Sequence, residues 1–274
     1  MGEKLQLRIY GDASLPALIY LPGLHGDWTI IGSFRAAIAG KVRFVEMIYP
    51  RTLTWSLDDY AAAIEAALLE NGISSGWLLG ESFGSQPVWA MVERFNENSS
   101  GQKLQIDGII LAGGFVRVPT FWILRWADAI AGKIALSLLT QIIFPATNKI
   151  FAQCYKKWSH RRFRRSPQTL EKINEFLERR TPLDFQAARH RLHLVAQNDP
   201  RDMAKNIRAP VFALTGWFDP IIPWYFVRRW LQKNCAGFRE FKIISGGDHA
   251  VLMTKPRESA EQILKWMRSF TIRN

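Results

Sequence analysis

The sequence predicts an α/β protein in which a mostly parallel central sheet is flanked by helices and carries an inserted all-helical subdomain. Short apolar runs that suit buried parallel strands recur along the chain and alternate with helical patterns. This alternation stops for about 90 residues, which have helical patterns only. The chain has 274 residues, of which 48% are hydrophobic and 22% charged, so it can bury a full-sized core and intrinsic disorder is excluded.

The expected strands begin at the N-terminus, where Leu5, Leu7 and Ile9 alternate with polar residues. Further strands are expected at residues 17–21, 42–48, 77–80, 106–112, 211–216 and 238–244, each an apolar run. A helix is expected over residues 57–70, because Ser56 and Asp59 form a capping-box pattern at its start and Asn-Gly follows its end. Another helix is expected over residues 83–96, directly after the strand at 77–80.

The helical stretch at residues 116–206 is predicted to be an insertion in a core formed by residues 1–115 and 207–274. Ser166-Pro167 and Thr181-Pro182 each place a capping residue before a proline at the first helical position. The stretch contains 17 Lys or Arg and 7 Asp or Glu, a net charge of +10, while the rest of the chain holds +2 of the total of +12. An insertion of this length over an α/β sheet usually covers a site, so we expect a strongly basic lid.

Several classes of protein are not supported by the sequence. The longest charge-free stretch in the aromatic-rich middle, residues 134–148, is shorter than the roughly 20 residues that span a membrane, and the N-terminus has no apolar signal-peptide centre. Two cysteines, Cys154 and Cys235, allow one disulfide at most and form no Cys-x-x-Cys pair, which favours a reducing, cytoplasmic location. No phosphate-binding Gly-x-x-x-x-Gly-Lys-Ser/Thr pattern occurs, so nucleotide chemistry is not expected.

The motif that carries chemistry is Gly80-Glu81-Ser82-Phe83-Gly84, which matches Gly-x-Ser-x-Gly. In this pattern the serine lies on a tight turn between a strand and a helix, and the glycines let the backbone pack closely. Here a predicted strand leads into the motif and an amphipathic helix leaves it. Ser82 is therefore the candidate nucleophile.

A serine hydroxyl needs a histidine to take its proton, and the histidine needs an acid to fix its tautomer. His249 follows the last predicted strand on a glycine-rich loop, from which its imidazole can project over the carboxyl edge of the sheet. Asp219 follows the preceding strand and comes before a proline-rich turn. The order Ser82, Asp219, His249 is the order found in α/β hydrolases.

Other candidates for these roles are weaker. Asp248 adjoins His249, but a neighbouring side chain is poorly placed to support the imidazole, so a loop-capping role is expected for it. His160, His190 and His193 lie among arginines in the basic insertion and are interpreted as surface residues. No acidic or cysteine residues accompany His190 and His193, so a metal site is not expected there.

On these residues the chain resembles the α/β hydrolases of the serine type, with an inserted helical lid, over nearly its whole length outside the insertion. The resemblance implies an α/β-hydrolase fold and a serine esterase mechanism. Ser82 would attack an ester or thioester carbonyl, His249 would act as general base and then acid, and Asp219 would orient His249. Neither a cofactor nor a metal is implied. Related enzymes with aspartate at the nucleophile position, the haloalkane dehalogenases and epoxide hydrolases, are disfavoured by Ser82.

In that family a loop after an early strand supplies a backbone N–H to the oxyanion hole, and here the loop is Pro22-Gly23-Leu24-His25-Gly26. Two registers are possible. If His25-Gly26 is the family's His-Gly dipeptide, Asp27 becomes the donor residue and its carboxylate lies near the developing oxyanion, which is unfavourable. If Pro22-Gly23 takes that place, the donors are the N–H groups of Leu24 and Phe83. We favour the second register, in which proline stands where the family often has histidine.

The substrate is expected to be a small acyl ester or thioester, and an amphiphilic or anionic one is among the expectations. The same fold also hosts cofactor-free lyases and binding proteins, so these functions stay open. In the insertion the run at residues 156–165 includes Arg161, Arg162, Arg164 and Arg165. These arginines could bind an anionic substrate or touch a membrane surface, or form a solvated helix face, and nucleic-acid binding is the less favoured alternative.

Overall fold

The computed structural model describes residues 4–97, 104–117, 176 and 178–271. By its contacts the chain divides into two compact units. The first consists of Met1–Arg117 and Arg180–Asn274, and the second of Val118–Arg179. Every helix and strand whose bounds are given below lies in the first unit.

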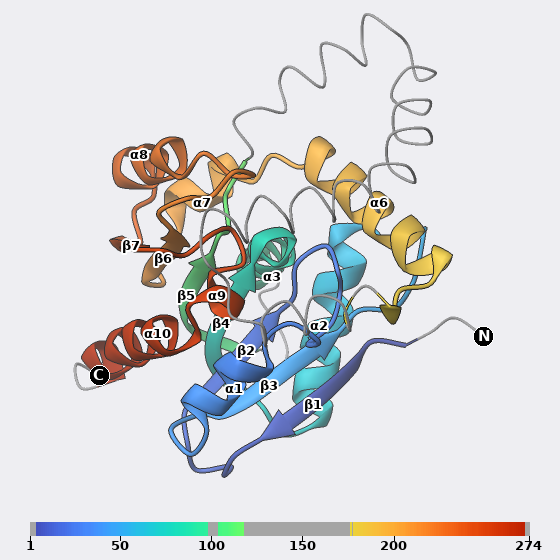
Figure 1. The fold of residues 1–274 in the computed structure, drawn as a ribbon, viewed down its shortest axis with the longest axis horizontal. Coiled ribbons are helices and arrows are strands. Elements are labelled where there is room, and N and C mark those ends of the chain that lie inside the picture. The colour runs from blue at the N-terminus through green and yellow to red at the C-terminus, as the bar shows by residue number, and fades with distance from the viewer. Residues whose placement is uncertain (1–3, 98–103, 118–175, 177, 272–274) are drawn as a thin grey trace, which may run out of the picture. The chain divides into compact units, whose positions relative to one another are not determined.

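A seven-stranded sheet forms the centre of the first unit, in the order β1-β3-β2-β4-β5-β6-β7 (Figure 1). The strands are β1 Gln6–Tyr10, β2 Ala17–Leu21, β3 Arg43–Ile48, β4 Ser75–Glu81, β5 Gln105–Ala112, β6 Val211–Gly216 and β7 Phe238–Ile244. Strand β1 pairs antiparallel with β3, and all other neighbours are parallel. The predicted mostly parallel central sheet is therefore confirmed.

Helices lie between most consecutive strands from β2 onward and follow the last strand, as the colour gradient of Figure 1 shows. They are α1 Gly32–Ile38, α2 Leu57–Glu70, α3 Ser85–Glu97, α6 Pro182–Gln197, α7 Arg201–Asn206, α8 Trp224–Asn234, α9 Val251–Thr254 and α10 Pro256–Thr271. Helix α2 has the predicted capping box of Ser56 and Asp59, and Thr181 with Asp184 caps α6 in the same way. Helix α3 begins two residues later than predicted, because Ser82–Gly84 forms a separate 3-10 turn, η1.

The core covers one face of the sheet with a continuous cluster of buried side chains. Alternate residues of the parallel strands point to this face, as the two-residue period of a strand requires. They pack with side chains of α1, α9 and α10; the cluster includes Leu18, Tyr20, Trp77, Leu79, Phe212, Phe34, Leu252 and Trp266. The carboxyl ends of the parallel strands meet at one edge of the sheet, where the candidate site lies.

The predicted insertion at residues 116–206 is described only in part. Helices α6 and α7 belong to the first unit by their contacts, whereas residues 118–175 and 177 lie outside the described residues. The all-helical lid and its boundaries stay predictions. Among the helices that are described, none combines the length and hydrophobicity needed to cross a membrane.

Candidate active site

Ser82 lies on the sharp turn between β4 and α3. Its φ of 50° is the only positive φ among the described non-glycine residues, a conformation that costs free energy and is held by its surroundings. Gly84 makes the turn possible, because a Cβ at this position would lie 2.0 Å from the carbonyl oxygen of Leu21. The turn and its glycines agree with the strand-to-helix setting predicted from the motif.

His249 lies beside Ser82 on the loop between β7 and α9. Its Nε2 is 2.8 Å from Ser82 Oγ, and its Nδ1 is 2.8 Å from Asp219 Oδ2. A neutral His249 that donates Nδ1–H to Asp219 can accept the Ser82 hydroxyl proton at Nε2. The structure thus brings together three side chains that lie up to 167 positions apart in the chain.

Asp219 is fixed on all sides by hydrogen bonds, and its side chain has no exposed surface. Oδ1 accepts the backbone N–H groups of Ile221 and Ile222 at 2.9 and 2.8 Å. Oδ2 accepts the Thr215 hydroxyl at 3.2 Å as well as the imidazole. Because these donors fix the position of the carboxyl group, Asp219 can hold the His249 ring in one orientation.

The electrostatic environment of His249 favours its protonated form. Burial acts to lower the pKa of His249, but the hydrogen bond and charge of Asp219, with the charges of Glu81 and Asp248, outweigh it and raise the pKa above 6.5. The imidazolium that forms when His249 takes a proton is therefore stabilised at this position.

Asp248 has the loop-capping role that was expected of it. Its Oδ1 accepts the N–H of Ala250 and the hydroxyl of Thr254, both at 3.1 Å. These bonds stay within the loop after β7 and the start of α9. They order the backbone on either side of His249 without competing for its ring.

The loop after β2, which carries the predicted oxyanion donor Leu24, is held by two arginines that the sequence did not single out. Arg191 of α6 is buried, with 2% of its surface exposed, and donates to the carbonyl oxygens of Leu24 and Pro50 at 2.8 and 3.0 Å. Arg180 pairs with Asp27 at 2.8 Å. The Asp27 carboxylate is thus engaged with Arg180, which suits the register that keeps it away from the oxyanion.

The second predicted donor, Phe83, follows Ser82 in η1. Its ring is buried and packs edge-on against Tyr49 and Tyr60. The backbone of this turn is therefore anchored by its side chain. That the N–H groups of Leu24 and Phe83 receive an oxyanion stays a prediction.

Three further groups lie beside the site and were not anticipated; Glu81 and Tyr20 are buried, and His25 is half-buried. Glu81 directly precedes Ser82, and its Oε2 accepts the hydroxyl proton of Tyr20. His25 Nε2 lies 3.5 Å from that hydroxyl and 4.0 Å from Glu81 Oε2. The sequence signal for this group was the carboxylate inside the motif. Its contact with Tyr20 depends on how the two strands pair, which the sequence did not show.

The four arginines predicted to bind an anion, and two of the histidines singled out in the sequence, stand as follows. Arg161, Arg162, Arg164 and Arg165 lie outside the described residues, as does His160. His190 is half-buried and its Nε2 lies 2.8 Å from the Trp55 carbonyl oxygen, so it is not a free surface residue as expected. In the described part of the chain, no group of three His, Cys, Asp or Glu side chains is arranged as metal ligands.

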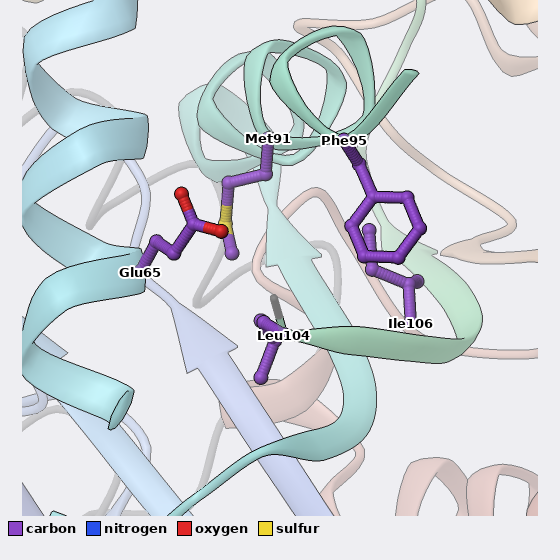
Figure 2. Close-up of a pocket in the computed structure, with 5 residues that line it drawn as sticks. All are labelled: Glu65, Met91, Phe95, Leu104 and Ile106. Atoms are coloured by element: carbon purple, nitrogen blue, oxygen red, sulfur yellow. The ribbon is translucent and has the colours of Figure 1, made fainter. Parts of the chain in front are cut away.

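A small cleft lies away from Ser82, between α2, α3 and the start of β5 (Figure 2). It is lined by Glu65, Met91, Phe95, Leu104 and Ile106. Leu104 and Ile106 lie at the amino end of β5, whereas Ser82 follows the carboxyl end of the parallel neighbour β4. The cleft is thus at the opposite edge of the sheet from the candidate site.

Comparisons with known proteins agree with this architecture. Residues 49–256 match the family described as alpha/beta hydrolase fold. Similar solved structures include a thermophilic esterase from Thermogutta terrifontis, with 19% identity, coverage of 97% of this chain and 93% of that chain, and a TM-score of 0.72. An esterase from Exiguobacterium antarcticum has 14% identity, coverage of 96% and 95%, and a TM-score of 0.71.

An enol-lactonase from Burkholderia xenovorans LB400 has 17% identity, coverage of 98% and 96%, and a TM-score of 0.66. At these identities the structural likeness establishes the fold alone. Among curated proteins no match was found.

Proposed function

Because the chain belongs to the α/β hydrolase fold family, we propose that it is a serine hydrolase that cleaves a carboxylic ester or thioester through an acyl-enzyme intermediate. The observation that supports this most directly is the position of His249, 2.8 Å from both Ser82 Oγ and Asp219 Oδ2. A nucleophile, a base and an orienting acid in hydrogen-bond contact are what this chemistry needs.

In the first step, the Ser82 hydroxyl proton passes to His249 Nε2 as Oγ forms a bond to the carbonyl carbon. The carbonyl electron pair moves to its oxygen, which the N–H groups of Leu24 and Phe83 would stabilise. His249 then gives its proton to the leaving alkoxide or thiolate as the bond to the acyl carbon breaks. In the second half, water loses a proton to His249 and attacks the acyl carbon. His249 then gives that proton to Ser82 Oγ as the bond from Oγ to the acyl carbon breaks, which releases the carboxylic acid and restores Ser82.

The fold family also includes other chemistries, so the reaction class needs direct support. The similar solved structures named above are two esterases and an enol-lactonase, and a lactone is a cyclic ester. The motif has a serine at position 82, between the glutamate at 81 and the phenylalanine at 83. Its side chain supplies a hydroxyl nucleophile, which is suited to acyl transfer. We therefore favour ester cleavage over a lyase or a purely binding function.

An amphiphilic substrate is the finer part of the proposal. Trp217 and Ile221, on either side of Asp219 in the chain, are 63% and 53% exposed. Trp217 is in ring contact with Trp224, and Trp224 with Tyr225 of α8, which is also exposed, so these side chains form a contiguous apolar patch. Because contiguous exposed apolar patches are often binding surfaces, this patch is suited to an acyl or aromatic group. An anionic substrate, suggested by the basic insertion, stays a prediction.

A fluorophosphonate probe followed by a graded substrate panel tests this function. We expect the probe to label Ser82, and turnover of p-nitrophenyl esters and the matching thioesters to vary with acyl length. Trp217→Ala should weaken the preference for long acyl groups and leave a short ester unaffected. A protein that neither reacts with the probe nor turns over any ester would contradict the proposal.

A further inference from the structure

Glu81 is a buried carboxyl group that directly precedes the candidate nucleophile in the chain. It ends β4, and with Trp77 and Leu79 it points to the face of the sheet that is covered by the core cluster. Tyr20 of the neighbouring strand β2 lies opposite Leu79 and donates its hydroxyl proton to Glu81 Oε2. The other oxygen, Oε1, is buried and has no hydrogen-bond partner within the described structure.

A group of this kind lowers the stability of the folded protein. A buried carboxyl with an unsatisfied oxygen destabilises a fold, and an apolar residue of similar size would often be neutral or better there. Burial raises the pKa of Glu81 to about 7, against the Tyr20 hydrogen bond and the charge of His249, which lower it. A carboxyl maintained in this state beside a candidate site is more readily explained by function than by stability.

The charged groups that face Glu81 come from two loops. From the loop after β2, His25 approaches Oε2 to 4.0 Å, but burial lowers the pKa of His25 to about 4, so it is neutral. From the loop after β7 come Asp248, whose charge repels that of Glu81, and His249, whose charge attracts it. His249 Nε2 also lies 2.8 Å from the Oγ of Ser82, the next residue in the chain after Glu81, so His249 is the cation that an ionised Glu81 stabilises.

We propose that Glu81 is a positioning residue whose carboxylate, acting through His249, stabilises the imidazolium that forms when His249 takes the proton of Ser82. This inference rests on the proposed serine hydrolase function. Asp219 holds the ring by its hydrogen bond at Nδ1, and Glu81 adds a second negative charge without touching the reacting atoms. Burial raises the pH at which Glu81 becomes ionised, and Tyr20 lowers it, because its hydroxyl stabilises the carboxylate.

Two substitutions should move the acid limb of the pH–kcat/KM profile in opposite directions. Glu81→Gln removes the negative charge that favours the imidazolium, so the limb should move to lower pH by about half a unit to one unit, and the plateau of kcat should fall about tenfold. Full activity needs both a neutral His249 and an ionised Glu81, so the limb reports the two groups together. Tyr20→Phe removes the donor that favours the carboxylate, so Glu81 should become ionised at higher pH and the limb should move to higher pH by about half a unit.

Glu46→Gln is the matched control, since Glu46 is an equally buried carboxyl on β3 and pairs with Arg35 at 2.7 Å, away from His249. It should leave the limb unchanged. Shifts of the same sign in both test variants, no shift in either, or an equal shift in the control would overturn the proposal. If Glu81→Gln does not fold, the alkaline shift of Tyr20→Phe decides alone.

The failure of this inference is separable from failure of the proposed function. The pH dependence of fluorophosphonate labelling at Ser82 reports whether a serine hydrolase is present at all. If Ser82 is labelled but the acid limb does not move in the variants, the role of Glu81 is rejected and the serine hydrolase function stands. If the wild-type protein is not labelled, both are rejected.

Discussion

Gly216 and Gly247 lie so close together that a Cβ atom on Gly216 would be 2.1 Å from the carbonyl carbon of Gly247. Gly216 ends β6, three residues before Asp219, and Gly247 comes two residues before His249. The loops that follow these two neighbouring parallel strands thus begin at the same point of the sheet edge. This close backbone approach lets the carboxylate of one loop reach the imidazole of the other.

Replacing Gly216 by alanine should therefore separate the two loops. A displacement of about 1 Å at a reacting group costs on the order of 100-fold in rate, so we expect at least that loss of kcat/KM. Gly32→Ala is the control, because the nearest atom to a Cβ there is 3.6 Å away on the flexible Arg35 side chain. The measurement is kcat/KM for ester hydrolysis by both variants. Full activity of Gly216→Ala would show that the loop spacing is not critical.

Substitution of the three predicted catalytic residues should abolish turnover without unfolding the chain. Ser82→Ala and His249→Ala remove the nucleophile and the base, and Asp219→Asn should lower kcat by about 10⁴, because the amide supports the wrong tautomer of His249. Thermal unfolding checks that the fold is intact. Wild-type activity of Ser82→Ala on a substrate that the protein turns over would exclude the serine mechanism.

The elements that could be predicted from the sequence are those with local causes. The apolar strands, the capping box at Ser56 and the nucleophile turn all depend on residues within a few positions of one another. The residues expected to work together, Ser82, Asp219 and His249, could be named because each follows a strand, and parallel strands end at one edge.

The contacts that could not be predicted depend on register and on packing between distant segments. Tyr20 and Glu81 meet because β2 and β4 pair with Tyr20 opposite Leu79, which a single sequence does not specify. Arg191 looked like one of many basic residues in the insertion, yet it is buried against the loop after β2. Net charge counts do not distinguish a buried guanidinium from a solvated one.

His25 and Glu81, whose pKa values are shifted in opposite directions, should give the chain a characteristic pH dependence of stability. The folded protein keeps His25 neutral with a pKa of about 4, so its contribution is full above pH 6.5 and is lost as the pH falls to 4. Glu81, with a folded pKa of about 7, behaves oppositely, and its contribution is full below pH 4.5 and is lost as the pH rises to 7. Each amounts to about 3 kcal/mol, so the two nearly cancel.

A variant that lacks one of these two groups should show the pH dependence of stability that the other group causes. Relative to wild type, the free energy of unfolding of His25→Asn should rise as the pH falls from 7 to 4.5, and that of Glu81→Gln should fall over the same range. Urea unfolding at the two pH values measures both differences. Parallel changes in the two variants would mean that these groups are not held in opposite states in the folded protein.

Arg191 should be important for stability despite carrying a buried charge. Arg191→Met leaves the carbonyl oxygens of Leu24 and Pro50 without their donor, so we expect a loss of about 2 to 4 kcal/mol. Arg201, an exposed arginine paired with Asp199, provides the control, and Arg201→Met should cost about 1 kcal/mol or less. Equal losses in denaturant unfolding would show that burial of Arg191 adds nothing.

The most direct test of the proposed mechanism is the detection of an acyl group on Ser82. Intact-protein mass spectrometry of samples quenched in acid within milliseconds to seconds of mixing with a p-nitrophenyl ester should show a transient mass increase equal to the acyl group. Peptide mapping should place that increase on Ser82, and it should be absent from Ser82→Ala. Turnover of the ester with no acyl adduct at any time, or an adduct on another residue, would contradict the account.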